Sequence, residues 1–438
     1  MWFEIQEVNA VWYFDATGCV IKDIKNQSMP FLYSIIMHDK KTKTIIPVAE
    51  FISTIQNSTW ISSNLFFIKT MMIENVRNKN KIAIAPVMVT DMSWALINAI
   101  HEAFNNCSIV QYLKWSYDVV TARNINFDMH SLMRVRTYLC SVHFLKIMKT
   151  HAKSKLHGIE KERQKNILKT FLFSFSILQN SKTLDEFEDN FKDFYFVFTQ
   201  KFQNDLYLTS IVKMKEKLAS RDDDNVLNEI LATKWVVDDV NTIFSVECSK
   251  KIKENSRYVN HFSKIVQSLV TTASIIKSNI KNDFCYPVLF ELIFEYIHLV
   301  PLWSGFIICD WQMKAFREIR FTIQSNNAVE GYFKHLKNNL ISKHSMPSQL
   351  VGAIYEMLQM KYFLHYYKDE SINKKPSKLP EKLDKWQKKR ICKREKGFYY
   401  KNNQQFGHSS YKSNESVDLQ EFPCLEHDGK YNSKTINT

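Results

Sequence analysis

Glycine and proline are scarce in this sequence, with 8 glycines and 9 prolines among 438 residues. Because these residues supply most tight turns, their scarcity argues against a many-turned all-β protein and favours a helix-rich chain. The 8 cysteines are spread along the chain without a CxxC pair, which excludes the disulfide framework of a small secreted domain and predicts reduced thiols. The first residues also lack the basic start and clean apolar run of a signal peptide.

A long apolar run free of charge is missing too. The stretch from Val288 to Cys309 is apolar, but it contains Glu291, Glu295 and His298, and each charge at bilayer depth is costly. We therefore expect a buried or amphipathic soluble helix there. What the sequence does have is a formal net charge of +14, which favours a polyanionic partner, either nucleic acid or an anionic membrane surface.

Short strands are expected in the first part of the sequence. Ala10 to Phe14 is an apolar and aromatic run that ends at a turn, which begins at Asp15. Phe31 to Met37 and Thr44 to Phe51 are two further runs joined by a short polar turn, a pattern that predicts an antiparallel hairpin. Pro47 places the third strand near a sheet edge or at a bulge, because proline cannot donate a backbone hydrogen bond.

A helix from about Trp60 to Asn75 is expected next, followed by the strongest strand pattern in the chain, Lys81 to Thr90. That run is apolar nearly throughout, as expected for a strand covered on both faces. Apolar residues then recur every three or four positions from Trp94 to Phe104, which is the period of an amphipathic helix. A later short strand, near Val135 to Cys140, leads into another helix.

From about Lys146 to Asp310 the sequence predicts a long helical region. We expect helices near Lys161–Leu178, Leu184–Thr199, Tyr207–Ala219, Asp238–Lys253 and Asn260–Ile280. From about Lys368 the composition changes to a segment rich in lysine and arginine, and then to a polar tail. Such a tail buries little apolar surface, so we expect it to be disordered or only partly helical.

Three acidic residues stand where their carboxylates can meet. Asp15 follows the first predicted strand, Asp91 ends the buried strand, and Glu330 begins a helix. If the two strands are neighbours, the three acids gather at one end of the sheet. Hard oxygen ligands there suit two Mg²⁺ or Mn²⁺ ions for phosphodiester cleavage, with Asp15 as the bridging ligand. Each acid also has a structural explanation, respectively a turn, a helix N-cap and a capping box with Asn327.

Four short motifs follow one another along the chain: Phe14-Asp15-Ala16-Thr17-Gly18, Val89-Thr90-Asp91-Met92-Ser93 with the small-apolar helix after it, Cys140-Ser141-Val142-His143, and Ser325 to Phe333 with Glu330. In this order they resemble the transposase domain of Mutator-like elements (MULE), which belongs to the RNase H-like DDE superfamily. They are similar to the family's two Asp motifs, its C-x-x-H element and its Glu motif. The resemblance covers about Trp12 to Leu340.

The resemblance implies an α/β fold, namely an RNase H-like mixed sheet with flanking helices and a large all-helical insertion, followed by a basic, partly disordered tail. We expect four parts: the first part of the core at residues 1–145, the helical insertion at 146–310, the last core helices at 311–367, and the tail at 368–438.

The resemblance also implies an enzyme, a DDE transposase that cleaves and transfers strands at transposon ends. Asp15, Asp91 and Glu330 are then the catalytic acids and the ligands of a two-metal Mg²⁺ or Mn²⁺ site. His143 is expected to approach these acids as a further catalytic residue, whereas a hydrogen-bonded packing role is the alternative. Cys140 is expected to pack at a strand–helix junction, because two ligands do not make a structural zinc site.

Basic residues near the last acid and in the tail are candidates for DNA contact. Lys334 and Lys337 follow Glu330 on roughly the same helical face, where they would meet phosphates; a solvated helix face is the alternative. The tail adds three candidates for salt-dependent DNA contact and a nuclear localisation signal, with a plain solvated tail as the alternative: Lys388, Lys389 and Arg390.

The expected partner is double-stranded DNA at transposon ends, bound by a homo-oligomer in the nucleus, with no membrane and no small-molecule cofactor. Larger transposases of this type commonly carry an N-terminal zinc-binding recognition domain, whereas this sequence begins about one strand before Asp15. A host-adopted or truncated derivative that binds DNA or protein without cutting is therefore the alternative function.

Overall fold

The computed structural model describes residues 11–371, apart from 19, 23, 40–43, 75–83, 122–133, 220–251, 274–278, 315–326 and 341–345. The chain divides into two units, Met1–Lys368 and Asp369–Thr438. All elements discussed below belong to the first unit, except for the last residues of its final helix. The division of the first unit into a split core and a helical insertion stays a prediction.

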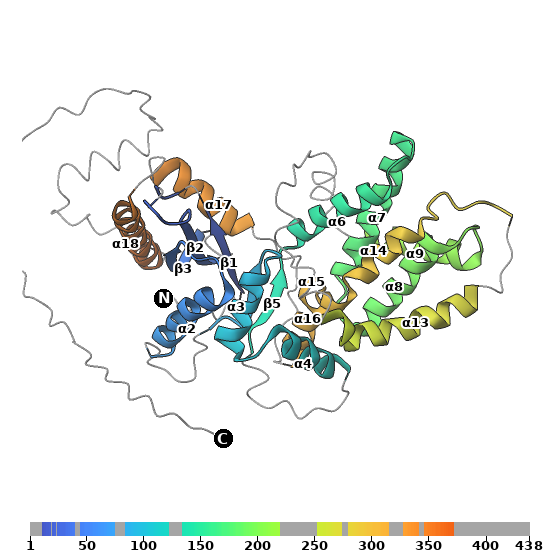
Figure 1. Ribbon diagram of the computed structural model, residues 1–438, viewed down its shortest axis with the longest axis horizontal. Helices are drawn as coiled ribbons and strands as arrows, with labels where there is room; N and C mark the ends of the chain where they lie inside the picture. The colour runs from blue at the N-terminus through green and yellow to red at the C-terminus, as the bar shows by residue number, and fades with distance from the viewer. Residues whose placement is uncertain are drawn as a thin grey trace, which may run out of the picture. The chain divides into compact units, whose positions relative to one another are not determined.

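A five-stranded mixed sheet forms the first half of this unit (Figure 1). Its strands are β1 (Val11–Thr17), β2 (Phe31–Asp39), β3 (Thr44–Ser53), β4 (Val87–Thr90) and β5 (Arg136–Leu139), in the spatial order β3-β2-β1-β4-β5. The pairs β1–β2 and β2–β3 are antiparallel, whereas β1–β4 and β4–β5 are parallel. Together with the many helices, this sheet confirms the predicted α/β class.

The hairpin of β2 and β3 confirms the interpretation of Pro47. β3 is the edge strand of the sheet, and the pairing register shifts between Ile35 and Ile36, where Ile36 lies opposite Pro47. A proline at this place removes no hydrogen bond from the interior of the sheet. The buried strand is shorter than predicted, since the described part of that segment is a strand only from Val87 to Thr90.

Helices cover both faces of the sheet because its side chains alternate in direction along each strand. On one face, Trp12 and Phe14 of β1 pack with Ile61 of α2 (Ser58–Glu74) and Ile100 of α3 (Trp94–Asn105). On the opposite face, Tyr13 of β1 belongs to a second cluster with α4 (Ile109–Thr121), α6 (Ser141–Lys155) and α17 (Asn327–His335). Asp15 lies two residues after Tyr13 and therefore points to this second face.

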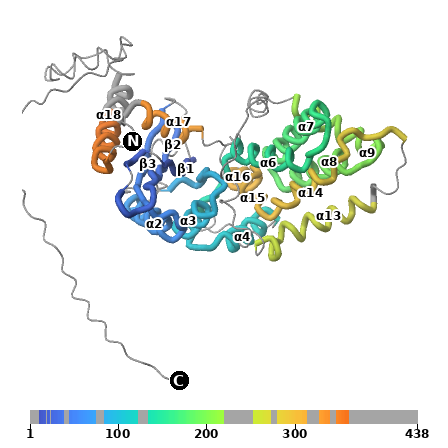
Figure 2. The backbone as a smooth tube through the Cα atoms, turned by 45° about the horizontal axis from the view of Figure 1, so that its top comes forward, coloured from blue at the N-terminus to red at the C-terminus, as the bar shows by residue number. Residues whose placement is uncertain are grey.

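A bundle of helices follows the sheet in the chain. It consists of α7 (Lys161–Gln179), α8 (Leu184–Thr199), α9 (Asp205–Ala219), α13 (Arg257–Ala273), α14 (Pro287–Glu295), η1 (Ile297–Leu299), α15 (Val300–Trp303) and α16 (Phe306–Lys314). Neighbouring helices such as α7 and α8 lie side by side (Figure 2). The predicted helix 184–199 is confirmed to the residue, whereas the helix predicted from Asn260 begins at Arg257. The prediction at Asp238–Lys253 falls mainly outside the described residues.

Aromatic residues fill the core of the bundle and connect it to the sheet. The ring of Trp303 lies 5.1 Å from Phe175, 5.5 Å from Phe187 and 5.8 Å from Phe144 of α6. The hydroxyl of Tyr138 in β5 donates a hydrogen bond to the Trp303 carbonyl at 3.2 Å. These aromatic rings therefore pack as core, as the helical spacing favours, and Trp303 joins the bundle to the sheet.

The chain returns to the sheet after the bundle. α17 is followed by η2 (Leu336–Leu340) and α18 (Pro347–Ser371), and α17 contacts β1, β2 and β3. The apolar stretch from Val288 to Cys309 is divided among four helical pieces. Within the described ranges, no helix combines the length and apolar character that crossing a bilayer requires.

Stability should depend on pH through a buried histidine of α3. His101 is fully buried, with its ring 4.1 Å from that of Tyr112, and burial lowers its pKa to about 3. The unfolded chain binds a proton near pH 6.5, so His101 contributes stability above that pH and loses it as the pH falls. Between pH 7.5 and 5.5 we expect this residue to lower the free energy of unfolding by about 1.4 kcal/mol.

Chemical denaturation of the wild type and His101→Gln at both pH values measures this contribution. Between pH 7.5 and 5.5, the free energy of unfolding of the wild type should fall by about 1.4 kcal/mol more than that of the variant. Equal falls would show that the folded protein protonates His101 as readily as the unfolded chain.

Candidate active site

Asp15 lies within β1 and not at its end. It is paired with Ser34 of β2, and the strand continues to Thr17. The turn interpretation of Asp15 is therefore wrong, because the residue has extended backbone in the middle of a ladder. Its half-buried side chain accepts a hydrogen bond from the backbone N–H of Ala16 at 2.7 Å, which holds the carboxylate at the surface of the sheet.

Asp91 follows β4 immediately and lies beside β1. The parallel pairing of the two strands places Phe14 opposite Thr90, so the residue after each of them is an aspartate at the same end of the sheet. Asp91 is not the N-cap of α3, since that position is occupied by Ser93. Its backbone carbonyl accepts a hydrogen bond from Ser93 N–H at 2.7 Å.

His143 connects the second and third acids. It lies in the first turn of α6, directly after β5 and the N-cap residue Cys140. Its Nδ1 is 2.6 Å from Asp91 Oδ1, and its Nε2 is 3.0 Å from Glu330 Oε1. His143 therefore lies within hydrogen-bonding distance of two of the acids, and a catalytic role for it stays a prediction. Between 26% and 44% of each of these three side chains is exposed, so solvent and ions can reach them.

Glu330 reaches the site because α17 packs across the sheet. Val329, Tyr332 and Phe333 are buried beneath this helix. The hydroxyl of Tyr332 donates a hydrogen bond to Glu50 Oε1 at 2.7 Å, and Glu50 also accepts one from Ser34 at 2.9 Å. Sequence reasoning missed Glu50; the only available signal was a charged residue in a strand otherwise rich in apolar residues.

Removing the Tyr332 hydroxyl should weaken the attachment of α17 to the sheet through Glu50 of β3. We expect Tyr332→Phe to lower the free energy of unfolding by about 1–3 kcal/mol, because it removes a hydrogen bond to a charged, largely buried carboxylate. Tyr355→Phe on α18 is the matched control, since the Tyr355 side chain is exposed and its change should be near zero. Urea denaturation measures both, and equal small effects would contradict an anchoring role for Tyr332.

The electrostatics of the cluster favour a cation among the acids. Burial and the nearby Asp91 carboxylate raise the pKa of Asp15 well above its usual value. Burial alone would lower the pKa of His143, but hydrogen bonds with Asp91, Cys140 and Glu330 outweigh it and raise the pKa to about 12. The hydrogen bond from His143 lowers the pKa of Glu330. The imidazolium of His143 thus compensates part of the negative charge.

An open cleft of about 410 Å³ gives access to the cluster. Asp15, His143 and Glu330 line it together with Lys334 and Lys337. Lys337 Nζ donates a hydrogen bond to Thr17 Oγ1 at 2.7 Å, so η2 is bound to the end of β1. The structure therefore brings both predicted lysines to the rim of the acidic cleft. The other basic candidates, at positions 388–390, lie outside the described residues.

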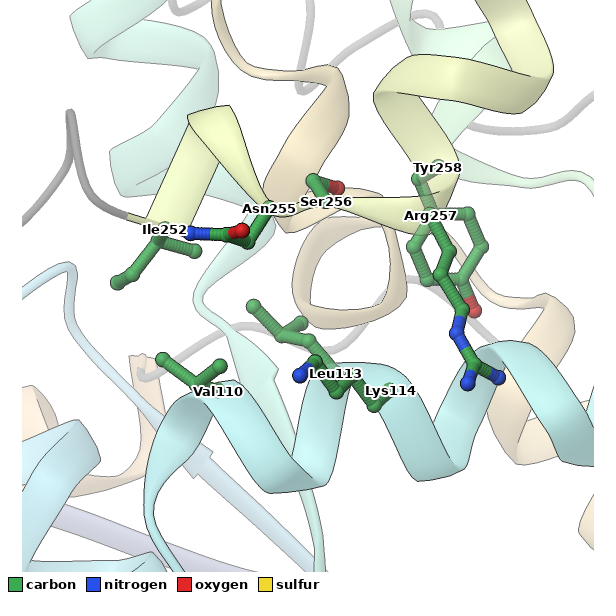
Figure 3. Close-up of a pocket in the computed structure, with 8 residues that line it drawn as sticks. All are labelled: Val110, Leu113, Lys114, Ile252, Asn255, Ser256, Arg257 and Tyr258. Carbon is green, nitrogen blue, oxygen red and sulfur yellow. The ribbon is translucent and has the colours of Figure 1, made fainter.

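A second hollow, between α4 and the turn before α13, is far smaller (Figure 3). Its volume is about 10 Å³, which is room for one water molecule. Leu113 of α4 points toward this hollow, and Arg257, which also lines it, forms an ion pair with Asp118. We regard the hollow as a packing feature of the bundle and not as a ligand site.

A comparison with known proteins found one from a transposable element, which agrees with the resemblance of the four motifs. No protein-family profile matches the chain. It is similar to a 120.7 kDa protein in the NOF-FB transposable element of Drosophila melanogaster, at 22% identity over 405 residues. The chain is thus distantly related to a protein of a transposable element. The match covers 88% of this chain but 34% of the other protein, so the chain spans about a third of its relative's length.

Proposed function

We propose that this chain is the catalytic core of a Mutator-like DNA transposase with an RNase H-like fold. The observation that carries the proposal is that Asp15, Asp91 and Glu330, from three distant segments, lie close together at one end of the central strands. The mixed sheet and its flanking helices fit the mixed sheet that the resemblance implies. Distant similarity to a transposable-element protein supports the transposon-related part of the proposal.

The donor set fits divalent metal ions. Three carboxylates offer only hard oxygen atoms, which suit Mg²⁺ and Mn²⁺. The Asp15 carboxylate interacts electrostatically with both other acids. Two such ions roughly 4 Å apart supply an activated oxygen nucleophile and stabilise the leaving oxygen of a phosphodiester. In our proposal Asp15, Asp91 and Glu330 hold the ions, and His143 holds a proton next to the reacting groups.

Contacts with DNA would come from the lysines at the rim of the cleft. Lys334 and Lys337 lie within reach of a phosphate backbone that enters beside Glu330. The net charge of +14 adds long-range attraction, which should weaken steeply as salt increases. We further propose that the chain acts on double-stranded DNA at transposon ends, as a homo-oligomer in the nucleus. The basic residues 388–390 would contribute to DNA binding and to nuclear localisation.

Nicking of a supercoiled plasmid by the purified chain tests the proposed activity. We expect nicked and linear products with Mn²⁺ or Mg²⁺, and none when EDTA removes the metal. Glu330→Gln, which keeps the size of the side chain, is expected to remove the activity but not the binding of DNA. A folded wild type that binds DNA and Mn²⁺ without nicking would overturn the catalytic proposal in favour of a non-catalytic DNA-binding derivative.

A further inference from the structure

Three side chains of different chemistry converge behind the acidic cleft. One ligand atom each from Asp91, Cys140 and His143 lies within 4.8 Å of the other two. The sheet fixes this arrangement, because β4 and β5 are parallel and pair Thr90 with Leu139. The backbone N–H of Cys140 donates a hydrogen bond to the Thr90 carbonyl at 2.8 Å, so the residues that follow the two strands stand side by side.

The donor atoms differ in kind from those of the carboxylate cluster. A thiolate and an imidazole are preferred by Zn²⁺, Co²⁺ and Cd²⁺, whereas Mg²⁺ and Ca²⁺ avoid them. In a tetrahedral zinc site the ligand atoms are roughly 3.3–3.6 Å apart, as bond lengths of about 2.0–2.3 Å require. In the structure no two of the three ligand atoms are more than 4.8 Å apart, and His143 Nδ1 and Asp91 Oδ1 are 2.6 Å apart. Side-chain movements on the order of 1 Å would bring the three atoms to the spacing of a tetrahedral site.

Glu330 orients the imidazole for such a site. It lies 3.0 Å from Nε2 of His143, so a proton on Nε2 is held by the carboxylate while Nδ1 faces Asp91. Metal-bound histidines commonly donate their second nitrogen to a carboxylate in this way, which fixes the ring and strengthens the ligand. Cys140 is itself buried, but the partial exposure of Asp91 and His143 gives an ion a path from solvent.

We propose that Asp91, Cys140 and His143 bind a thiophilic divalent cation such as Zn²⁺. The thiol of Cys140 and Nδ1 of His143 release their protons to solvent on binding, and a water molecule takes the fourth position. Binding itself does not depend on the proposed nuclease activity. Only one consequence rests on that proposal: the ion shares Asp91 with the Mg²⁺ or Mn²⁺ site, so Zn²⁺ inhibits cleavage by competing for this residue.

Titration of the chelator-treated full chain with Co²⁺ tests the site. We expect a near-ultraviolet thiolate-to-cobalt charge-transfer band and the intense visible bands of tetrahedral Co²⁺, both removed by Zn²⁺. Cys140→Ser should lose the charge-transfer band and keep Mn²⁺ binding, whereas Asp15→Asn should keep the band and lose Mn²⁺ binding. Cys107→Ser, a matched control at a half-buried thiol outside the cluster, should behave as the wild type.

A band that persists in Cys140→Ser, or that is missing from the folded wild type, would overturn the proposal. If Cys140→Ser does not fold, zinc K-edge X-ray absorption on the wild type decides the question. We then expect one sulfur neighbour at about 2.3 Å together with nitrogen and oxygen neighbours, and a zinc ion without sulfur would contradict the site. Failure of Mn²⁺ binding alone would count against the proposed nuclease and not against this site.

Discussion

Replacing Asp15 by asparagine is expected to abolish Mn²⁺ binding and to lower metal-dependent DNA cleavage by about 1000-fold or more. The Asp15 carboxylate interacts electrostatically with both Asp91 and Glu330, and in our proposal it is the ligand that two ions share. The fold should survive, because burial and the Asp91 carboxylate disfavour a charge at this position. We expect the free energy of unfolding of Asp15→Asn to be unchanged or higher.

Isothermal titration with Mn²⁺ and plasmid nicking measure the two effects. Asp189→Asn is the matched control, because Asp189 is a mostly exposed acid paired with Lys192 on α8. The control should bind Mn²⁺ and cleave as the wild type does. If Asp15→Asn binds Mn²⁺ and cleaves DNA as the wild type does, Asp15 is not a metal ligand. The proposed metal site at this end of the sheet would then be contradicted.

Replacing Trp303 by alanine should give the largest loss of stability. The side chain is fully buried and contacts rings from α6, α7 and α8, and its indole N–H donates a hydrogen bond to the Tyr296 carbonyl at 3.1 Å. A buried tryptophan truncated to alanine costs about 3–5 kcal/mol through lost burial and a residual cavity. Because Trp303 packs on Phe144, beside His143, the variant should also disturb α6.

Thermal and urea unfolding of Trp303→Ala check this expectation against Trp60→Ala. Trp60 of α2 is about half exposed, at 47%, and its removal should change the free energy of unfolding by less than about 1 kcal/mol. Similar losses in the two variants would contradict the central position of Trp303 between the bundle and the sheet.

Periodicity in the sequence was a good guide to the helices and to the hairpin. Residues 184–199 form the predicted helix because Thr183 caps it, accepting a hydrogen bond from the backbone N–H of Glu186, and because its aromatic residues fit one core. The strand ends were less predictable. β1 extends past Asp15 because pairing with β2 continues to Thr17, and such pairing is a tertiary contact that no local pattern encodes.

The sequence predicted that the three acids gather if the two strands are neighbours, but it did not predict the contacts within the cluster. The order of strands brings Asp15 beside Asp91 only when β4 inserts next to β1, and this neighbourhood depends on the whole sheet. His143 contacts both Asp91 and Glu330 only because α17, about 190 residues later in the chain, packs on the sheet beside it. Cys140 was expected only to pack, since its closeness to Asp91 comes from the β4–β5 pairing.

Anomalous diffraction from crystals of the chain soaked in Mn²⁺ tests the central claim most directly. We expect manganese peaks bounded by the carboxylates of Asp15, Asp91 and Glu330, with His143 displaced from at least one of the two acids that it now contacts. Manganese bound only elsewhere, with the His143 contacts intact, would contradict a metal-dependent active site at this edge of the sheet.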